Sequence, residues 1–334
     1  MSVTTALADA YDCLLLDLDG VVYVGADAVA GAVPALQHAR TSGIAVGYVT
    51  NNASRTADRV AAHLCSFGLD VSPEHVTTSA QVAAAQVRKR WGAGARVLAV
   101  GGPGVSAALM EQELVVVRSA EDDPQAVVQG YGPKVGWADL AEVAFAVQRG
   151  AWWVATNTDL TVPTPRGVAP GNGSLVRAVR GAVDVDPVVA GKPEPVAFHT
   201  AANRLGACCP LVIGDRLDTD IEGGRAAGMD TLLVLTGVHG PRDLLEAPVK
   251  RRPTHLGHNL RALSLPPLDR EIASDGSVAR CGQAVVTVTN GRASAAAVGR
   301  DQLELLWAAL GVLWYATDDG TTLRLDDALH AVFT

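Results

Sequence analysis

The chain has 334 residues, of which 49% are hydrophobic and 19% charged, a composition typical of a globular protein with room for roughly two or three packed units. The formal net charge of −8 argues against a nucleic-acid partner and against binding to an anionic membrane surface. No apolar run approaches the roughly 20 residues needed to span a bilayer, and the first residues have neither the basic start nor the apolar stretch of a signal peptide.

The cysteine pattern favours a reducing compartment. The five cysteines are odd in number, and neither the adjacent pair Cys208 and Cys209 nor the isolated Cys13, Cys65 and Cys281 has the spacing of a disulfide framework or a metal site. Free thiols are typical of the cytoplasm. Together with the lack of a signal sequence, this predicts a cytoplasmic protein.

Short apolar runs alternate with helical patterns at the start of the chain. Cys13–Leu16 is an uninterrupted apolar run that stops at Asp17, as a strand buried on both faces does. The pattern continues with a helix over Val29–Thr41, a strand over Ile44–Val49 and a helix over Thr56–Phe67. This alternation predicts βαβ units and therefore a parallel sheet.

A second series of strands and helices begins after about residue 90. Strands are predicted over Arg96–Val100, Leu114–Arg118, Ala126–Gly130 and Trp152–Ala155, and helices near Val105–Glu113 and Asp139–Arg149. The first pattern then resumes with a helix after Pro195 and strands over Leu211–Ile213 and Thr231–Leu235. The simplest interpretation is a small α/β unit, residues 91–186, inserted into a core of residues 1–90 and 187–260.

Two segments rich in proline and basic residues, around 250–253 and 265–267, separate the last part of the chain. There, Ala284–Thr289 and Thr322–Leu325 have strand patterns, and Asp301–Ala316 has a helical pattern more apolar than one face of an isolated helix requires. Residues 265–334 are therefore predicted to form a small C-terminal α+β accessory domain that packs on a neighbouring surface. Because this segment has no paired carboxylates, nucleophile or metal spacing, we expect the chemistry within the first 260 residues.

The first candidate site follows the strand over Cys13–Leu16. If strand geometry continues through Asp19, the carboxylates of Asp17 and Asp19 point to one side of the chain and Leu18 points to the other. Two close carboxylates repel each other and favour a hard divalent cation such as Mg²⁺. Taken alone, the pair is equally well explained as two acidic residues at a corner between a strand and a loop.

Two further stretches offer groups that suit an anion. Thr50, Asn51 and Asn52 follow the next strand and combine a hydroxyl, two amides and main-chain N–H groups. On their own, these residues are better explained as a cluster that caps the following helix. Lys192, within Gly-Lys-Pro-Glu-Pro, offers a compact charge to a phosphate, although by itself it is a surface lysine in a turn.

The fourth stretch contains Asp215, Asp218 and Asp220. Asp215 comes at the end of an apolar strand, which is where ligand sites lie in open parallel sheets. Asp220 begins a predicted helix and, alone, is typical of an acidic residue at a helix N-terminus. Asp218, between them, is expected to face solvent.

The order of these stretches is more informative than any one of them. In sequence, DLDGVVY, TNN, GKP and GDRLDTDI closely resemble the four motifs of haloacid dehalogenase superfamily phosphatases, and of the nitrophenylphosphatase-like (NagD-type) subfamily in particular. The stretch Ala155–Asp159, followed by Pro163, is similar to the cap signature of that subfamily. The resemblance extends over roughly residues 11–240. It implies an α/β fold with a Rossmann-like parallel-sheet core and an inserted α/β cap of type C2.

The resemblance also implies catalytic roles. Asp17 would attack phosphorus and form an aspartyl-phosphate, while Asp19 would protonate the leaving alcohol and then activate the attacking water. Mg²⁺ would be bound by the Asp17 carboxylate, the Asp19 main-chain carbonyl and Asp215. Asp220 would be a further ligand or would orient the ligands.

The same resemblance implies that Thr50, Asn51 and Lys192 bind the phosphate group. Lys192 would offset negative charge on both the nucleophile and the phosphate. Candidates for binding the rest of the substrate are Asn52, Asn157, Asp159 and the turn Gly171-Asn172-Gly173, although each of them is also explained as loop structure.

In this subfamily the cap closes over the active site and selects the substrate. Members act on glycerol phosphate, phosphoglycolate, pyridoxal phosphate, nucleotides or nitrophenyl phosphate. The long C-terminal segment and alanine-rich composition are similar to those of actinobacterial members, which implies glycerol 3-phosphate as the substrate and a nucleotide or other small-metabolite phosphatase as the alternative.

Two other classes of protein are disfavoured. A non-catalytic phosphate-binding scaffold has no need of Asp19 beside Asp17, and a dehalogenase has no need of Asp215 with Asp220 because it uses no Mg²⁺. The expected partner is thus a small phosphate ester, and the sequence leaves open whether the chain forms a homo-oligomer.

Overall fold

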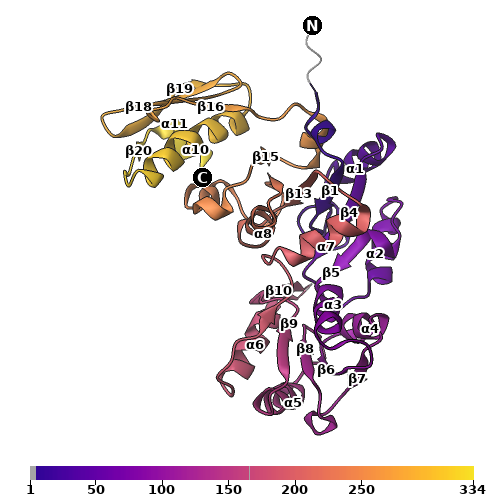
Figure 1. The fold of residues 1–334 in the computed structure, drawn as a ribbon. Helices are drawn as coiled ribbons and strands as arrows, with labels where there is room; N and C mark the ends of the chain where they lie inside the picture. Colours follow the sequence, from indigo (N-terminus) through magenta and orange to yellow (C-terminus); the bar gives the residue numbers. More distant parts are fainter. Residues whose placement is uncertain (1–4, 165) are drawn as a thin grey trace. The chain divides into compact units, whose positions relative to one another are not determined.

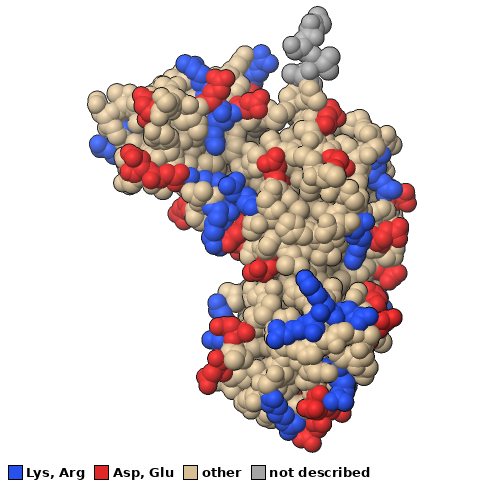
Figure 2. All heavy atoms as spheres, in the orientation of Figure 1, with Lys and Arg blue, Asp and Glu red and all other residues tan. Residues whose placement is uncertain are grey.

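The computed structural model of the chain describes residues 5–164 and 166–334 (Figure 1). Residues 1–4, part of the stretch considered above for a signal peptide, lie outside that description. The contacts divide the chain into two compact units, a first unit of residues 1–44 and 209–334 and a second unit of residues 45–208. Acidic and basic side chains are interspersed over the face shown in Figure 2. Among the described residues, no helix combines the length and apolar character needed to cross a membrane.

A parallel sheet forms the centre of the first unit. β1 (Cys13–Leu16) pairs with β13 (Pro210–Gly214), β13 pairs with β14 (Asp230–Val234), and β14 pairs with β15 (His255–Gly257). Every residue of β1 is buried, as expected for a parallel strand covered on both faces. The strands predicted in this part of the chain are confirmed to within one residue at each end.

Short helices and turns connect these strands. They comprise α1 (Ala32–Thr41), α8 (Glu222–Ala226), α9 (Pro241–Leu245), the hairpin β2 (Tyr23–Val24) and β3 (Asp27–Ala28), and the 3₁₀ turns η1 (Leu7–Ala10), η5 (Val249–Arg251) and η6 (Leu260–Ser264). The prediction that the first helix starts at Val29 is wrong, because Gly31 adopts a left-handed φ of +84° and α1 can start only after it.

A second sheet in the first unit forms the C-terminal module, residues 265–334. Its strands are β16 (Arg270–Ile272), β17 (Val278–Cys281), β18 (Ala284–Thr289), β19 (Arg292–Val298) and β20 (Arg324–Leu325), in that order across the sheet. The first four pair antiparallel and β20 pairs parallel with β19. The sheet is accompanied by the long helix α10 (Gln302–Asp318) and the short helix α11 (Asp327–Val332).

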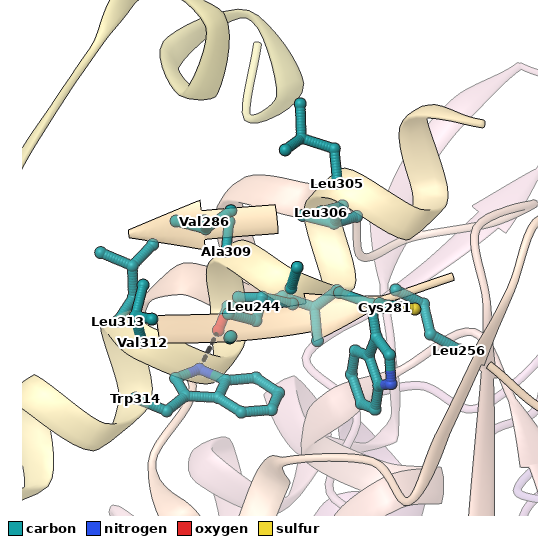
Figure 3. Packing of buried hydrophobic residues seen from close by; sticks show 14 of the residues in the cluster. Leu244, Leu256, Cys281, Val286, Leu305, Leu306, Ala309, Val312, Leu313 and Trp314 are labelled. Carbon is teal, nitrogen blue, oxygen red and sulfur yellow. Dashed lines mark hydrogen bonds between the residues drawn. The ribbon is translucent and has the colours of Figure 1, made fainter. Parts of the chain in front are cut away.

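α10 joins the C-terminal module to the rest of the first unit through one hydrophobic core. Its apolar residues lie in the same cluster as Leu244 of α9 and Leu256 of β15 (Figure 3). Leu217 belongs to this cluster as well. Trp314 Nε1 also donates a hydrogen bond of 2.9 Å to the carbonyl of Leu244. This explains why α10 is apolar on nearly all sides, since it is covered on several faces.

The second unit contains β4 (Ala45–Thr50), which pairs in parallel with β5 (Val76–Thr78). The helices nearby are α2 (Ala57–Ser66), α3 (Ser79–Trp91) and α7 (Val196–Leu205). Side-chain hydroxyls cap two of them: Thr56 accepts from the Arg59 N–H before α2, and Thr78 accepts from the Gln81 N–H before α3.

The inserted segment of the second unit forms its own parallel sheet. The strand order is β12 (Val188–Val189), β9 (Trp152–Ala155), β8 (Ala126–Gln129), β6 (Arg96–Val100) and β7 (Val115–Val117). The other elements of this segment are α4 (Pro103–Glu111), α5 (Trp137–Gln148), α6 (Asn172–Arg180), the 3₁₀ turn η3 (Ala120–Asp122) and the hairpin of β10 (Thr161–Thr164) with β11 (Gly167–Pro170), whereas the 3₁₀ turn η2 (Pro73–His75) precedes β5. Leu98, Val127, Val143, Trp153 and Val176 are part of its buried core.

The predicted fold class is confirmed: a parallel-sheet α/β core, an inserted α/β segment and an additional C-terminal sheet with helices. The contacts group residues 45–90 with the inserted segment, whereas the sequence patterns group them with the core. The domain bounds read from the sequence therefore stay a prediction.

Candidate active site

Three carboxylates from separate parts of the first unit converge. One carboxylate oxygen each from Asp17, Asp215 and Asp220 lies within 4.8 Å of the other two. The residues are largely buried, with an exposed fraction of 9% for Asp17 and 1% for each of the others. Carboxylates this close repel one another, and a divalent cation that prefers oxygen ligands removes the repulsion. The cluster therefore fits Mg²⁺.

The parallel pairing of β1 with β13 brings Asp17 and Asp215 together. Leu16 lies opposite Ile213, so the two aspartates follow their strands at the same edge of the sheet. The Asp17 N–H continues the ladder by donating to the Ile213 carbonyl at 2.9 Å. Ligand sites in open parallel sheets form at this edge, which is why strand ends were informative in the sequence.

Two glycines allow the chain to pass close to Asp215. A Cβ on Gly20 would lie 2.6 Å from Asp215 Oδ2, and one on Gly237 would overlap the same carboxylate. The Val238 N–H donates to Asp215 Oδ2 at 2.7 Å, and Thr236 Oγ1 donates to the Gly20 carbonyl at 2.5 Å. The sequence analysis did not identify this loop after β14 as part of the site. The only sign of it in the sequence is Gly237, a glycine that follows an apolar strand.

Asp220 lies in a π-helical turn, η4 (Leu217–Ile221), and α8 begins two residues after it. The Arg216 N–H donates to Asp220 Oδ2 at 3.2 Å. Gly214 leaves the space that the carboxylate occupies, because a Cβ there would overlap it. π-helical turns are rare and recur at functional sites, and here the turn holds Asp220 beside the end of β13.

Asp19 lies in a tight turn directly after Asp17. The Tyr23 N–H donates to the Leu18 carbonyl at 3.2 Å, and Gly20 has a left-handed φ of +84°. Leu18 is buried, whereas Asp19 is exposed. The two carboxylates of the first motif therefore have different surroundings, one at the buried edge of the sheet and one at the surface of the unit.

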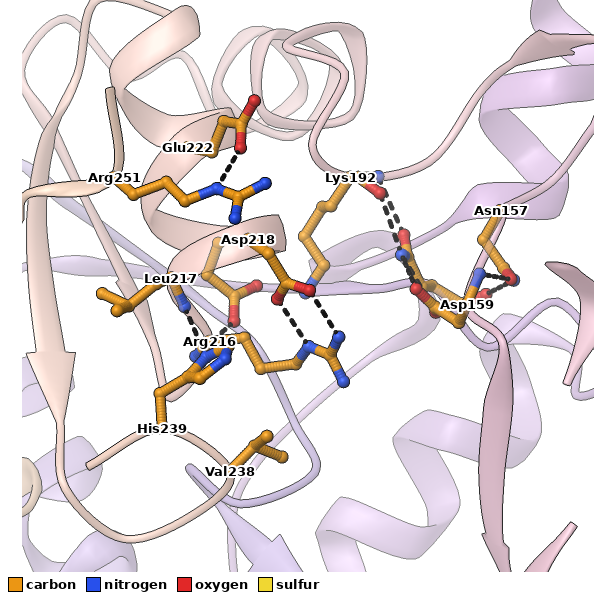
Figure 4. A network of polar contacts seen from close by, with 12 residues as sticks. Asn157, Asp159, Lys192, Arg216, Leu217, Asp218, Glu222, Val238, His239 and Arg251 are labelled. Carbon is orange, nitrogen blue, oxygen red and sulfur yellow. Dashed lines mark hydrogen bonds and ion pairs between the residues drawn. The ribbon is translucent and has the colours of Figure 1, made fainter. Parts of the chain in front are cut away.

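Asp218, which was expected to face solvent, is half-exposed, and its carboxylate is bound by Arg216. Two guanidinium nitrogens of Arg216 donate to Asp218 at 3.1 and 2.9 Å, and both side chains are 34% exposed (Figure 4). Burial alone would raise the pKa of Asp218, but the hydrogen bonds and charge of Arg216 lower it below its usual value. His239 completes this network, since its Nδ1 accepts from the Leu217 N–H at 2.9 Å.

In the second unit, the side chain of Asn51 binds the main chain of Lys192 twice. The Lys192 N–H donates to Asn51 Oδ1 at 2.8 Å, and Asn51 Nδ2 donates to the Lys192 carbonyl at 3.1 Å (Figure 4). Lys192 Nζ donates to the carbonyl of Val49 at 3.0 Å, and the side chain is buried, with 2% exposure. The interpretation of Lys192 as a surface lysine is thus wrong: its ammonium group is fixed at the carboxyl end of β4.

Thr50 and Asn52 shape the turn that follows β4. Thr50 is buried, and its Oγ1 accepts from the Asn52 N–H at 3.1 Å. Asn52 Oδ1 accepts from the N–H and the hydroxyl of Ser54, at 3.0 and 2.7 Å. These contacts form the turn at the end of the strand, and the first helical residue comes only at Ala57.

Residues of the inserted segment contact Asn51 from another direction. Asn157 Nδ2 donates to the Asn51 carbonyl at 2.7 Å, and Asp159 Oδ2 accepts from Asn51 Nδ2 at 3.2 Å. Behind them, Asn172 Nδ2 donates to the Asn157 carbonyl at 2.7 Å. Asn157 and Asn172 are buried, with 5% and 1% exposure. These long-range contacts had no signal in the sequence, where Asn157, Asp159 and Asn172 were considered only as substrate contacts or loop residues.

Comparisons with known proteins agree with this geometry. The chain matches the haloacid dehalogenase-like hydrolase family over residues 14–114 and a HAD-hydrolase-like family over residues 189–263. It is 50% identical to the D-glycerol 3-phosphate phosphatase of Mycobacterium tuberculosis over 258 residues, 77% of this chain and 72% of that protein. It is 37% identical to an acid sugar phosphatase of Staphylococcus aureus over 236 residues, 70% of this chain and 90% of that protein.

Solved structures give the same result. The glycerol phosphate phosphatase of Mycobacterium tuberculosis in complex with magnesium has a TM-score of 0.87 and 42% identity, covering 98% of this chain and 97% of that chain. The 4-nitrophenylphosphatase of Thermotoga maritima has a TM-score of 0.72 and 28% identity, covering 78% of this chain and 98% of that chain. The chain belongs to the haloacid dehalogenase-like hydrolases. The predicted family and phosphatase class are confirmed, and the magnesium complex of the relative agrees with the predicted cofactor.

Proposed function

We propose that this phosphatase hydrolyses glycerol 3-phosphate with Mg²⁺ through an aspartyl-phosphate on Asp17. The observation that carries the proposal is the convergence of Asp17, Asp215 and Asp220 at one sheet edge. The substrate is supported by the 50% identity to a D-glycerol 3-phosphate phosphatase over most of both chains. The similarity of the magnesium-bound structure extends over 98% of this chain and therefore includes the C-terminal module.

Asp17, Asp215, Asp220 and the main-chain carbonyl of Asp19 would hold the metal. When bound, Mg²⁺ supplies positive charge that offsets the repulsion between a carboxylate nucleophile and a phosphate dianion. Asp17 is held by the sheet through its N–H, which directs the carboxylate at a fixed position. One of its oxygens attacks phosphorus, the bond from phosphorus to the alcohol oxygen breaks, and an acyl phosphate forms on Asp17.

Asp19 would act as the general acid and then as the general base. Its exposed position allows the carboxyl group to exchange protons with water between the two steps. In the first step it gives a proton to the departing glycerol oxygen. In the second it takes a proton from the water that attacks the acyl phosphate, and Asp17 is released as a carboxylate.

Thr50, Asn51 and Lys192 would bind the phosphate group. The buried ammonium group of Lys192 and the hydroxyl of Thr50 both lie at the carboxyl end of β4 in the second unit. Lys192 is held in place by Val49 and by Asn51, so little side-chain entropy is lost when it binds an anion.

The cap residues would contribute in two ways. Asn157 would hold the main chain of Asn51 and thereby position the phosphate-binding turn, whereas Asp159 is a proposed contact to substrate hydroxyl groups, as is Asn52 of the core. We further propose residues 1–90 and 187–260 as the catalytic core, residues 91–186 as the cap and residues 265–334 as the accessory domain. The proposed setting is the cytoplasm, with a small-molecule partner and neither nucleic acid nor membrane, in line with the net charge of −8.

A panel of phosphate esters tests this proposal. The purified chain is assayed with glycerol 3-phosphate, phosphoglycolate, glucose 6-phosphate, adenosine monophosphate and nitrophenyl phosphate, each with Mg²⁺ and with a chelator. Glycerol 3-phosphate should give the highest kcat/KM, and only with Mg²⁺. A higher kcat/KM for the sugar phosphate or the nucleotide would show that glycerol 3-phosphate is not the preferred substrate. Turnover that does not depend on the metal would overturn the mechanism.

A further inference from the structure

Arg270 of the C-terminal module is a half-buried cation, and no carboxylate of the described residues forms an ion pair with it. Its guanidinium carbon lies 4.1 Å from the ring centroid of Trp307 and 5.1 Å from that of Trp314, and Nη1 donates to the Trp307 carbonyl at 3.1 Å. Burial and the like charge of Arg252 lower the pKa of Arg270 to about 10, so the group is protonated at pH 7. Among the ion pairs of the described residues, none includes Arg270.

Arg270 lines an open cavity of about 300 Å³ in the first unit, together with two other arginines. Arg225 comes from α8, and Arg252 precedes β15. Trp314 and Tyr315 of α10 supply apolar walls.

The charges of this cavity do not balance. Asp318 is the one carboxylate in its lining, and both of its oxygens are bound by Arg252, at 2.5 and 2.7 Å. Arg225 is exposed and, like Arg270, takes part in none of the ion pairs formed by the described residues. The cavity therefore has an excess of positive charge although the chain as a whole has a net charge of −8.

We propose that this cavity is a second anion site, distinct from the catalytic carboxylates, that binds the phosphate or carboxylate group of a small metabolite. Even partial burial of a cation is costly unless an anion or other partner compensates it. The stacking on two indoles supplies part of that compensation. A guanidinium presents N–H groups in a planar fork that matches an oxyanion, and Arg225 and Arg270 together provide two such forks. The volume of the cavity fits a small metabolite rather than a macromolecule.

The proposed anion site lies between two segments of the first unit. Arg225 belongs to α8, which begins two residues after Asp220, whereas Arg270, Trp314 and Asp318 belong to the C-terminal module. An anion bound by Arg225 and Arg270 links these two segments. Since it binds only the folded chain, it raises the melting temperature.

Thermal unfolding of the full chain tests the site. Melting temperatures are measured with chelator in sodium phosphate, sodium succinate and sodium chloride at equal ionic strength, for the natural chain and for Arg225→Gln. The matched control is Arg280→Gln on β17, whose exposed side chain is outside the cavity lining. In the natural chain and in the control, phosphate or succinate at about tenfold the Kd should raise Tm by about 3 °C or more relative to chloride.

Arg225→Gln should lose at least half of that increase. Arg270→Lys should also reduce it, because lysine keeps the positive charge beside the indoles but loses the planar fork that matches an oxyanion. An effect of phosphate alone identifies a phosphate-bearing ligand, and an effect of succinate alone identifies a carboxylate. The proposal is overturned if the increase is the same in Arg225→Gln as in the natural chain, if chloride gives it equally, or if no anion gives it.

Discussion

The side-chain amide of Asn157 donates a hydrogen bond of 2.7 Å to the main-chain carbonyl of Asn51, at the start of the turn proposed to bind phosphate. Ser79 Oγ donates to the same carbonyl at 2.8 Å, and Asn172 Nδ2 holds the Asn157 main chain from behind. A buried carbonyl with two donors is fixed in orientation, and its neighbouring peptide N–H groups are fixed with it. We therefore propose Asn157 as a positioning residue for the turn that is proposed to bind phosphate.

Replacing Asn157 with Ala should weaken phosphate binding more than it slows the chemical step. The Asn51 carbonyl keeps Ser79 as a partner, so the turn stays folded but gains freedom. Loss of one buried hydrogen bond of this kind costs about 1–2 kcal/mol, which corresponds to about a tenfold increase in KM and in the inhibition constant of inorganic phosphate.

Steady-state kinetics and inhibition by inorganic phosphate measure this effect. Asn203→Ala on α7 serves as the control, because that side chain is exposed. A fall in kcat with unchanged KM and unchanged phosphate inhibition would assign Asn157 to another role.

Removal of the metal should abolish turnover reversibly. With a chelator, the close carboxylates of Asp17, Asp215 and Asp220 repel one another, and activity should return when Mg²⁺ is added. Ca²⁺ should inhibit, because it accepts more oxygen ligands and would bind both oxygens of Asp17, which would leave none to attack phosphorus.

The melting temperature provides a readout that is independent of activity. Mg²⁺ should raise Tm in the natural chain and much less in Asp215→Asn, since one of three converging carboxylates is then lost. Asp27→Asn, at an exposed position on β3, is the control and should respond as the natural chain does. Full activity after exhaustive chelation would contradict the metal site.

Trp314→Ala should destabilise the whole first unit, not only the C-terminal module. Trp314 is 5% exposed, lies in the core shared with Leu244 and donates to the Leu244 carbonyl. Truncation of a buried tryptophan to alanine costs about 3–5 kcal/mol of unfolding free energy. Urea unfolding measures it, and Trp137→Ala is the matched control because that indole is 82% exposed. Equal unfolding free energies for the two variants would show that the shared core contributes little.

The elements that the sequence analysis predicted best are those whose pattern is local. β6, β9 and β18 have the predicted bounds, because each is an apolar or β-branched run with a clear end. β19 was missed, since Ala-Ser-Ala-Ala-Ala has little preference for a strand and is held in place by pairing with β18. α6 was missed because it begins with Asn-Gly-Ser, which is typical of a turn.

The same distinction applies to the site. Asp17 and Asp215 could be placed together from the sequence, because parallel strands end at one edge and both residues directly follow an apolar strand. The contacts of Asn157 with Asn51 and of Arg216 with Asp218 could not be predicted from the sequence. An amide or an arginine in a loop has many equally good partners before the fold is known.

Acidification should destabilise the first unit partly through His255. Tyr11 Oη lies 2.8 Å from His255 Nε2, and burial lowers the pKa of His255 below its ordinary value, despite the nearby Asp230. The unfolded chain therefore takes up a proton at a higher pH than the folded chain. The contribution of the neutral ring is complete above the unfolded pKa of about 6.5 and is lost as the pH falls below it.

Urea unfolding at pH 7.5 and pH 5.5 measures this dependence. The loss of stability between the two values should be smaller in His255→Gln than in the natural chain, because glutamine does not take up a proton. His38→Gln, at an exposed position of α1, should lose as much stability as the natural chain. If His255→Gln loses as much unfolding free energy between the two pH values as the natural chain does, His255 does not contribute to the destabilisation by acid.

The most direct test of the proposed mechanism is the turnover of glycerol 3-phosphate with Mg²⁺ by Asp17→Asn. The amide has nearly the same shape as the carboxylate but is not nucleophilic, so kcat should fall at least about 10⁴-fold, or about 5 kcal/mol of barrier, with an unchanged circular dichroism spectrum. A variant that folds normally and keeps a tenth of the natural kcat would contradict the role of Asp17 as the nucleophile.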